Sequence, residues 1–261
     1  MGTWQVIVHR SGGGGEFPPP QFDLRYFINL VVKGGPVLSF IGERRKYYTG
    51  DIYNPMMTVK YDSGQFPHDT TIKVTVTRPA DSIGNILSRS GLINPSVFDA
   101  DTIPARQTTL TELDNKAGSP VVKYVNESYN LLNDPANTGG LFEAHGIFGY
   151  ALKDVLRTEG DYTFHAFATY GHDCISTREL VWSIHVDCGI DSGKTEVQTT
   201  VTATLPDGKQ MVTVVFTPKD VYGNNFGPGR GGDFTVTGAG GSTFTEPVTD
   251  NGNGTYEVVV T

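Results

Sequence analysis

Alternating apolar and polar residues form the strongest pattern along the chain. Between residues 22 and 33, apolar side chains fall on consecutive even positions, with Asp23, Arg25 and Asn29 among the residues between them. A period of two is typical of a strand that buries one face. Similar segments predict strands at residues 2–9, 37–41, 57–61, 72–77, 162–170 and 178–186. Pro79 is expected to end the strand that begins at residue 72.

The last part of the chain contains shorter β-type segments separated by turn residues. They predict strands near residues 197–204, 212–217, 234–237, 243–245 and 256–260. Pro206-Asp207-Gly208 has the composition of a hairpin turn between the first two of these strands. Short strands with turn signals between them favour antiparallel sandwiches. We therefore predict an all-β fold with two antiparallel β-sandwiches in tandem.

Two regions depart from this pattern. Residues 105–117 follow Pro104 and precede Gly118, which are start and stop signals of a helix. This predicts a partly helical insertion around residues 80–130. Residues 11–20 contain consecutive glycines and then consecutive prolines, which predicts a linker. The expected domains are an N-terminal strand and linker at 1–20, a sandwich with its insertion at 21–192, and a second sandwich at 193–261.

Composition excludes some function classes. The formal net charge is −8 over 261 residues, whereas binding to a phosphate backbone needs clustered Lys and Arg. The basic run at Glu43–Lys46 is interpreted as a solvated loop, and no nucleic-acid partner is expected. No apolar run approaches the roughly 20 residues that a membrane-spanning helix needs. We expect no membrane insertion, and no signal peptide is visible in this segment.

Cys174 and Cys188 are the two cysteines of the chain. The predicted strand at residues 178–186 lies between them and would hold them about 40 Å apart. A disulfide needs Cα atoms within about 7 Å of each other. We therefore predict that these cysteines do not pair with each other.

Two loop motifs near the C-terminus carry a resemblance. Asp220-Val221-Tyr222-Gly223-Asn224, followed by Asp250-Asn251-Gly252-Asn253-Gly254-Thr255-Tyr256, resembles the filamin-type and invasin-type bacterial Ig-like repeat. In that repeat, the first motif follows the third strand and the second enters the next-to-last strand. The resemblance covers roughly residues 194–261 and implies an Ig-like sandwich there.

The middle of the chain is similar to Ig-like domains that follow von Willebrand A-type modules in large bacterial surface proteins. The similarity rests on Leu132-Asn133-Asp134, His145-Gly146-Ile147-Phe148 and Glu159-Gly160-Asp161-Tyr162-Thr163-Phe164. Together the two resemblances imply tandem Ig-like β-sandwiches in an extracellular or cell-surface protein. The implied roles are spacing, adhesion or support of a neighbouring domain.

The resemblance also implies that the second sandwich lacks its last strand, because one more strand follows residues 256–260 in such repeats. The segment Trp4–His9 would fill that groove by β-strand addition, in the same molecule or in a neighbouring one. Addition to a neighbouring molecule would give head-to-tail self-association. The alternative is that the chain boundary has no structural meaning.

Side chains that can bind metals gather in two places. His165 and His185 are expected on one outer face of the 162–170/178–186 hairpin with Asp187, and two histidines with a carboxylate can hold zinc. Asp250 and Asn253 offer oxygen atoms of the kind that calcium prefers. The alternatives are a polar strand face and turns stabilised by Asn and Asp. We predict no cofactor, with calcium as the alternative.

Tyr47, Tyr48 and Tyr53 lie close together between two predicted strands. Aromatic rings on an open surface would stack on a sugar, whereas rings packed inwards would stabilise the sandwich. The direction of the rings decides between these interpretations.

No enzyme is predicted, because the sequence contains no G-x-S-x-G and no P-loop. We predict a non-catalytic extracellular spacer or adhesion segment of a larger modular bacterial protein. The alternatives are a carbohydrate-binding or accessory module of a secreted enzyme, and a calcium- or zinc-binding β-sandwich. The expected partners are neighbouring domains of the parent protein and a protein or glycan surface ligand. The residues expected to matter for structure are the core anchors Tyr162, Trp182 and Tyr256 and the turn formers Gly160, Gly223 and Gly254.

Overall fold

The computed structural model describes residues 35–41, 46–90, 103–132, 146–172, 175–238, 240, 242–245 and 247–261. All of them belong to the second of two units into which the chain divides, Gly35–Thr261. The predicted strands at 2–9 and 22–33, the linker at 11–20 and Cys174 lie outside the described residues.

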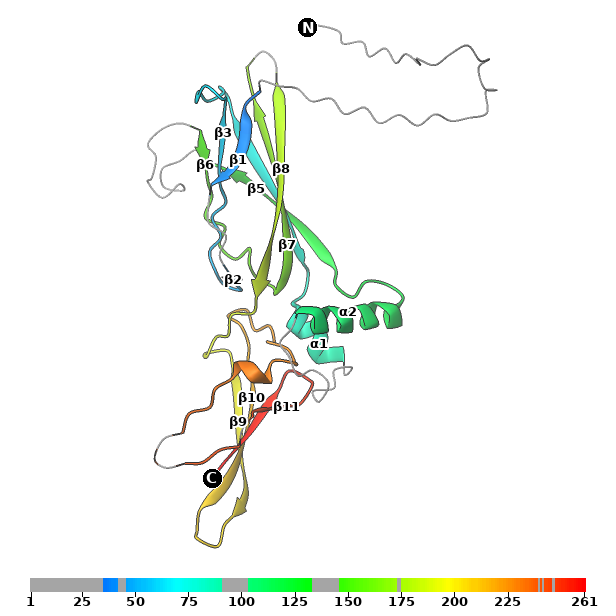
Figure 1. Ribbon diagram of the computed structural model, residues 1–261, viewed down its shortest axis with the longest axis vertical. Coiled ribbons are helices and arrows are strands. Elements are labelled where there is room, and N and C mark those ends of the chain that lie inside the picture. The colour runs from blue at the N-terminus through cyan, green and yellow to red at the C-terminus, as the bar shows by residue number, and fades with distance from the viewer. Residues whose placement is uncertain are drawn as a thin grey trace, which may run out of the picture. The chain divides into compact units, whose positions relative to one another are not determined.

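The described part of the chain is mostly β-structure (Figure 1). Its strands and helices are, in order, β1 Val37–Ile41, β2 Tyr47–Tyr48, β3 Met56–Lys60, β4 Thr71–Pro79, α1 Ile83–Ser90, α2 Ile103–Ala117, β5 Tyr124–Leu131, β6 Ile147–Phe148, β7 Gly160–Tyr170, β8 Ser176–Asp187, β9 Glu196–Thr204, β10 Gln210–Thr217, the 3₁₀ turn Gly231–Asp233, β11 Thr249–Asp250 and β12 Tyr256–Val260. The all-β prediction is confirmed.

Two sheets form the first sandwich. One has the strand order β2-β8-β7-β4-β5 and the other the order β1-β3-β6. Their pairs are antiparallel except for β2, which pairs in parallel with the end of β8. Side chains of both sheets, such as Met57 and Phe164, belong to one buried core. Figure 1 shows β1, β3 and β6 lying along the longer sheet.

Alternation along β7 and β8 explains this core. Buried and exposed residues alternate strictly from Gly160 to Ala168, as a period of two requires when one face meets a core. Phe164 lies opposite Trp182 in the ladder, and the two rings stack with centroids 5.1 Å apart. Tyr53 contacts Phe164 at 4.8 Å, and its hydroxyl accepts a hydrogen bond from Trp182 Nε1. The long hairpin is thus fixed by an aromatic stack.

The C-terminal sheet has the strand order β11-β12-β10-β9. One face packs on a small core in which Phe216, Phe226, Phe234 and Tyr256 contact one another. Tyr256 is fully buried, and its hydroxyl donates to the Gly227 carbonyl. Every residue of β9, in contrast, is exposed.

Four local predictions differ from the structure. Helix α1 and strand β5 lie in a region predicted to have one helix and otherwise irregular chain. Strand β4 continues through Pro79, which is tolerated at the end of a ladder. Residues 234–237 form no strand. Phe234 still packs against the core, from an irregular segment between the 3₁₀ turn and Gly238. Near residues 243–245 the pairing is a single bridge from Phe244 to Val260.

Each missed element has a physical reason. In β5, the charged Glu127 occupies a half-buried, inward position between Val125 and Tyr129, which hides the period of two. In α1, one glycine and two serines lower the helix propensity. The helix is stabilised instead by tertiary packing, which buries Leu87 completely. The helix predicted at 105–117 is present as α2.

Candidate functional site

The outer face of the β7–β8 hairpin holds the predicted histidines. His165 and His185 do lie on the same face, but they make separate contacts. His165 Nε2 is 3.0 Å from Glu179 Oε2, and His185 Nδ1 is 2.7 Å from Asp161 Oδ1. The register places His165 opposite Val181 and His185 opposite Asp161. The two histidines therefore contact two different carboxylates and share no ligand position.

His185 lies between two carboxylates. Besides Asp161, it has Asp187 Oδ1 at 3.6 Å from Nε2, and Lys46 Nζ is 3.0 Å from the other oxygen of Asp187. Hydrogen bonding to Asp161, and then to Asp187, raises the pKa of His185 to about 9 against a smaller opposing effect of burial. The same contacts with His185 lower the pKa values of Asp161 and Asp187. The imidazole of His185 thus lies between the carboxylates of Asp161 and Asp187, and Asp187 also pairs with Lys46.

The zinc site at His165, His185 and Asp187 stays a prediction, which the raised pKa of His185 bears on. Zinc binds the neutral imidazole of histidine, and a histidine with a raised pKa keeps its proton. No group of three or more His, Cys, Asp or Glu side chains suited to a metal occurs among the described residues. The polar strand face, which was the alternative interpretation, accounts for the contacts of His165, His185 and Asp187.

The predicted calcium ligands serve the backbone of their own loops. Asp250 accepts hydrogen bonds from Gly252 N and Gly229 N, one on each carboxylate oxygen. Asn253 Oδ1 accepts from both the backbone and the hydroxyl of Thr255. These are turn-stabilising bonds of Asx type. The calcium alternative at Asp250 and Asn253 stays a prediction.

The predicted tyrosine cluster is packed mainly inwards. Tyr47 is 8% exposed and Tyr53 only 2%, and their rings meet edge to face at 5.2 Å. Tyr48 is 40% exposed, and the ammonium group of Lys46 lies over its ring at 5.2 Å. A sugar-stacking platform needs open rings, which Tyr47 and Tyr53 do not offer. Their position is that of core residues.

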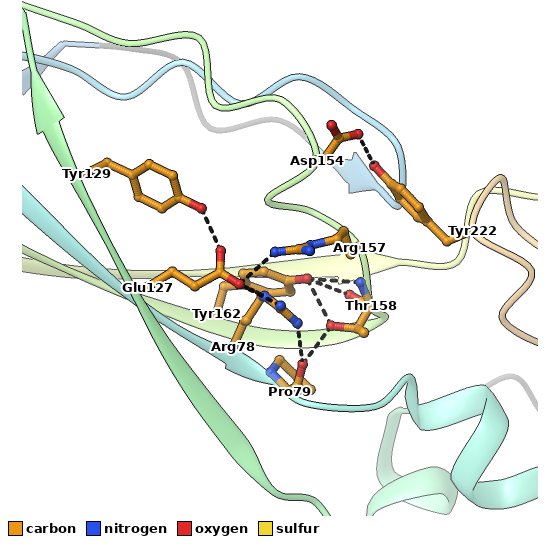
Figure 2. Close-up of polar contacts among 9 residues, drawn as sticks. All are labelled: Arg78, Pro79, Glu127, Tyr129, Asp154, Arg157, Thr158, Tyr162 and Tyr222. Atoms are coloured by element: carbon orange, nitrogen blue, oxygen red, sulfur yellow. Dashed lines mark hydrogen bonds and ion pairs between the residues drawn. The ribbon is translucent and has the colours of Figure 1, made fainter.

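Sequence reasoning did not find the charged cluster around Glu127 (Figure 2). Arg78 donates from Nε and Nη2 to Glu127 Oε1, and Arg157 Nη2 donates to the same oxygen at 2.6 Å. The hydroxyl of Tyr129 donates to the other oxygen. Burial opposes ionisation of Glu127, but the hydrogen bonds from Tyr129 and Arg78 outweigh it and lower its pKa.

Beside this cluster, a second network joins the start of β7 to the end of β4. The hydroxyl of Tyr162 donates to the Thr158 carbonyl, while the Thr158 hydroxyl and Arg78 Nη1 both donate to the carbonyl of Pro79 (Figure 2). The predicted anchor Tyr162 is fully buried. The two networks fix one end of the first sandwich.

That end contacts the Asp220–Asn224 loop, which lies between Phe216 and Phe226 of the C-terminal core. Tyr222 donates its hydroxyl hydrogen to Asp154 at 3.0 Å (Figure 2). Asn224 Nδ2 donates to the Arg157 carbonyl at 2.8 Å. Within the loop, fully buried Asp220 accepts from the backbone amides of Tyr222 and Asn224. The motif that carried the resemblance thus forms the junction between the two parts.

Helix α1 completes the junction. Asn85 Nδ2 donates to Asn224 Oδ1, and Asn85 Oδ1 accepts from Asn225 N at 2.8 Å. A Cβ atom on Gly84 would lie 2.0 Å from the carbonyl oxygen of Asn225. The backbones approach so closely there that only glycine fits.

A buried ion pair lies at the same place. Glu159 is fully buried, and its Oε2 accepts from Gly84 N at the first turn of α1. Its other oxygen is 3.5 Å from Arg230 Nη1. Arg230 also bonds Asp233, and its guanidinium lies 3.7 Å from the ring centroid of Phe226. A buried charge needs such partners. The sequence showed no signal for Gly84 or Asn85, and it gave Glu159 only as part of a motif, without its buried ion pair, because the partners are distant in the chain.

The predicted turn formers have different surroundings. Gly160, Gly223 and Gly254 all have positive φ, which favours glycine. A Cβ on Gly160 would come within 2.8 Å of Pro79, and one on Gly254 within 2.3 Å of the Ser88 hydroxyl. Gly223 has open space. Two of the three therefore combine a turn with a close approach.

The fold defines an all-β protein of sandwich type. No protein-family model matches the chain, and no curated protein matches it. Among solved structures, it is similar to invasin, a bacterial integrin-binding protein, at 14% identity and a TM-score of 0.29 over 87% of this chain and 33% of that one. It is also similar to domains 5–6 of the S-layer protein SbsC, at 11% identity and a TM-score of 0.22 over 87% of this chain and 85% of that one.

The chain spans about a third of the invasin structure that it matches. The filamin-type and invasin-type assignment from the loop motifs stays a prediction, as do the domain boundaries at residues 20/21 and 192/193. In the described part of the chain, no helix is long and apolar enough to cross a membrane.

Proposed function

We propose that this chain is a non-catalytic structural segment of an extracellular protein, a spacer that holds two β-units in a fixed orientation. A spacer acts through its stiffness, and its stiffness depends on the joint between its units. The observation that carries the proposal is the junction of α1 and the Asp154–Glu159 segment with the Asp220–Asn225 loop.

The contacts at this junction differ from those of a flexible linker. Flexible joints between domains are rich in Gly, Ser or Pro and make few contacts across them. Here Asn85 donates one hydrogen bond and accepts another across the joint. Tyr222 donates a hydrogen bond to Asp154, and Asn224 donates one to the carbonyl of Arg157. The backbones of Gly84 and Asn225 touch. Bending the joint would break these bonds together and expose the buried Glu159.

The titratable clusters support a non-catalytic role. Glu127, and the carboxylates of Asp161 and Asp187 beside His185, all contact cationic side chains. Each carboxylate accepts hydrogen bonds that stabilise its charged form. A general acid or base instead needs a pKa near the working pH and access to a substrate. The extracellular location and adhesion follow from the resemblance of the loop motifs.

Heat-induced unfolding of the whole chain tests the rigid joint. We expect the first sandwich and the C-terminal sheet to unfold in one calorimetric transition. Gly84→Ala should split or broaden that transition, because its Cβ has no room beside Asn225. The matched control is Gly232→Ala, where a Cβ meets no atom within 4 Å. Two separate transitions in the unaltered chain, or equal effects of both variants, would refute the rigid spacer.

Labelling of intact source cells tests the location. An antibody raised against this chain should stain intact cells as strongly as permeabilised ones. Staining that requires permeabilisation would refute the extracellular proposal and leave the rigid joint intact.

A further inference from the structure

The strand β9 is an unprotected edge of the C-terminal sheet. It pairs with β10 alone among the described strands. Its nine residues are all exposed, and the segment Val197–Thr204 contains no charge, proline or glycine. Natural edge strands are usually short, charged or interrupted, because their free N–H and C=O groups can pair with another chain. The edges β2 and β11, at two residues each, follow that rule. In β9 the ladder is irregular only at Thr202, and the stretch from Glu196 to Val201 pairs regularly with β10 and remains an open edge.

Apolar side chains continue from the core onto this edge. Val212, Val214 and Phe216 of β10 face Val260, Val258 and Tyr256 on one side. The same three residues face Val201, Thr199 and Val197 of β9 on the other side. Burial of these side chains decreases from β12 to β9: Val258 of β12 is 5% exposed, whereas Val201 of β9 is 52% exposed. The inner face of the sheet therefore ends in uncovered valines.

We propose that β9 is an interface at which a second copy of this chain binds, through antiparallel pairing of the two β9 strands about a two-fold axis at Thr199. In this register Val197 faces Val201 of the second copy, and Val201 faces Val197 of the second copy. Both valines already point to the inner face, so the pairing joins the two apolar rows. The two four-stranded sheets become one continuous sheet.

The charge pattern fits this self-pairing. Glu196 is the one charged residue of β9, and the two-fold register places it opposite Thr202 of the second copy. No like charges face each other in the ladder, which would be destabilising. The net charge of −8 on each chain opposes association at long range. Salt screens that repulsion and leaves backbone bonds and apolar contacts in place, so the dimer should strengthen as salt is added.

Sedimentation velocity of the full chain over a range of concentrations tests the interface. We expect a monomer–dimer equilibrium that stops at the dimer, because a two-fold interface is closed. Thr199→Lys places a lysine opposite its own copy and should weaken the dimer about fivefold or more. Thr199→Glu should do the same. An equimolar mixture of the two variants should restore dimers, since residue 199 then faces an opposite charge.

The matched control is Thr249→Lys, an exposed position on β11 at the other edge of the same sheet, which should leave the dimer unchanged. A chain that stays monomeric at every concentration would overturn the proposal. So would an equal effect of Thr249→Lys, or a mixture that dimerises no better than either variant alone. A ladder of oligomers beyond the dimer, abolished by Trp4→Ser, would overturn it in favour of head-to-tail addition of Trp4–His9. None of these outcomes bears on the rigid joint.

Discussion

His185 should make the stability of this protein depend on pH in the alkaline range. Its pKa is raised from 6.5 to about 9 in the folded chain by Asp161 and Asp187. The charged form is thus favoured by folding. The stabilisation is fully present below pH 6.5, where histidine is charged in both states, and is lost as the pH rises through about 9.

The magnitude follows from the shift and from the exposure of the ring. A rise from 6.5 to about 9 would correspond to roughly 3 kcal/mol if it applied in full. The side chain is 38% exposed, so solvent screening reduces the expected contribution to about 1–2 kcal/mol. The pKa values of Asp161 and Asp187 are lowered below 3.8 in the folded chain. Their contribution to stability is therefore lost only in strong acid, as the pH falls through these lowered values.

Urea unfolding of the full chain and of His185→Gln measures this contribution. Glutamine keeps a polar side chain of similar size but carries no titrating charge. The difference in unfolding free energy between the two proteins should be about 1–2 kcal/mol larger near pH 6 than near pH 10. The control is His165→Gln, which removes a histidine–carboxylate contact on the same face and leaves Asp161, His185 and Asp187 in place. A difference for His185→Gln that is the same at both pH values would refute the reasoning.

Two further predictions concern the core and the loops. Phe164→Ala should lower the unfolding free energy by about 3–5 kcal/mol, because the fully buried ring stacks with Trp182 and contacts Tyr53; a loss below about 1 kcal/mol in urea unfolding would contradict the aromatic stack as the centre of the core. Adding calcium or a chelator should leave the unfolding temperature unchanged, because Asp250 and Asn253 already accept bonds from Gly252, Gly229 and Thr255; a rise on adding calcium would show that these loops bind it.

The sequence predicted those strands and helices whose residue pattern is set by their own position in the chain, without a distant partner. The hairpin β7–β8 was predictable because buried and more exposed residues alternate along it and its inward residues from Tyr162 to Ala168 and from Leu180 to Val186 are apolar. Helix α2 was predictable from the proline and glycine at its ends. Strand β5 was not, because Glu127 takes an inward position that only the distant Arg78 and Arg157 make tolerable.

The candidate sites show the same division. The shared face of His165 and His185 was predictable from the period of two, whereas their separate partners depend on the register of two strands. Burial of Tyr47 and Tyr53 depends on which sheet covers them, and their local sequence does not encode it. The junction at Gly84, Asn85 and Glu159 joins segments that are up to 140 residues apart. A local pattern carries no trace of such contacts.

The place of β2 in the first sandwich has a consequence for how the chain folds. Tyr47 and Tyr48 pair with Val186 and Asp187, and nearby Gly189 donates to the hydroxyl of Thr49, 140 residues earlier in the chain. Closing so long a loop costs entropy before any contact rewards it, and sheets built from distant segments fold slowly. A ribosome must synthesise β8 before the strands already outside the exit tunnel can close their core. Until then β7 lacks its partner β8 and carries an open edge, so the nascent first sandwich is most vulnerable to aggregation during the synthesis of its last strand.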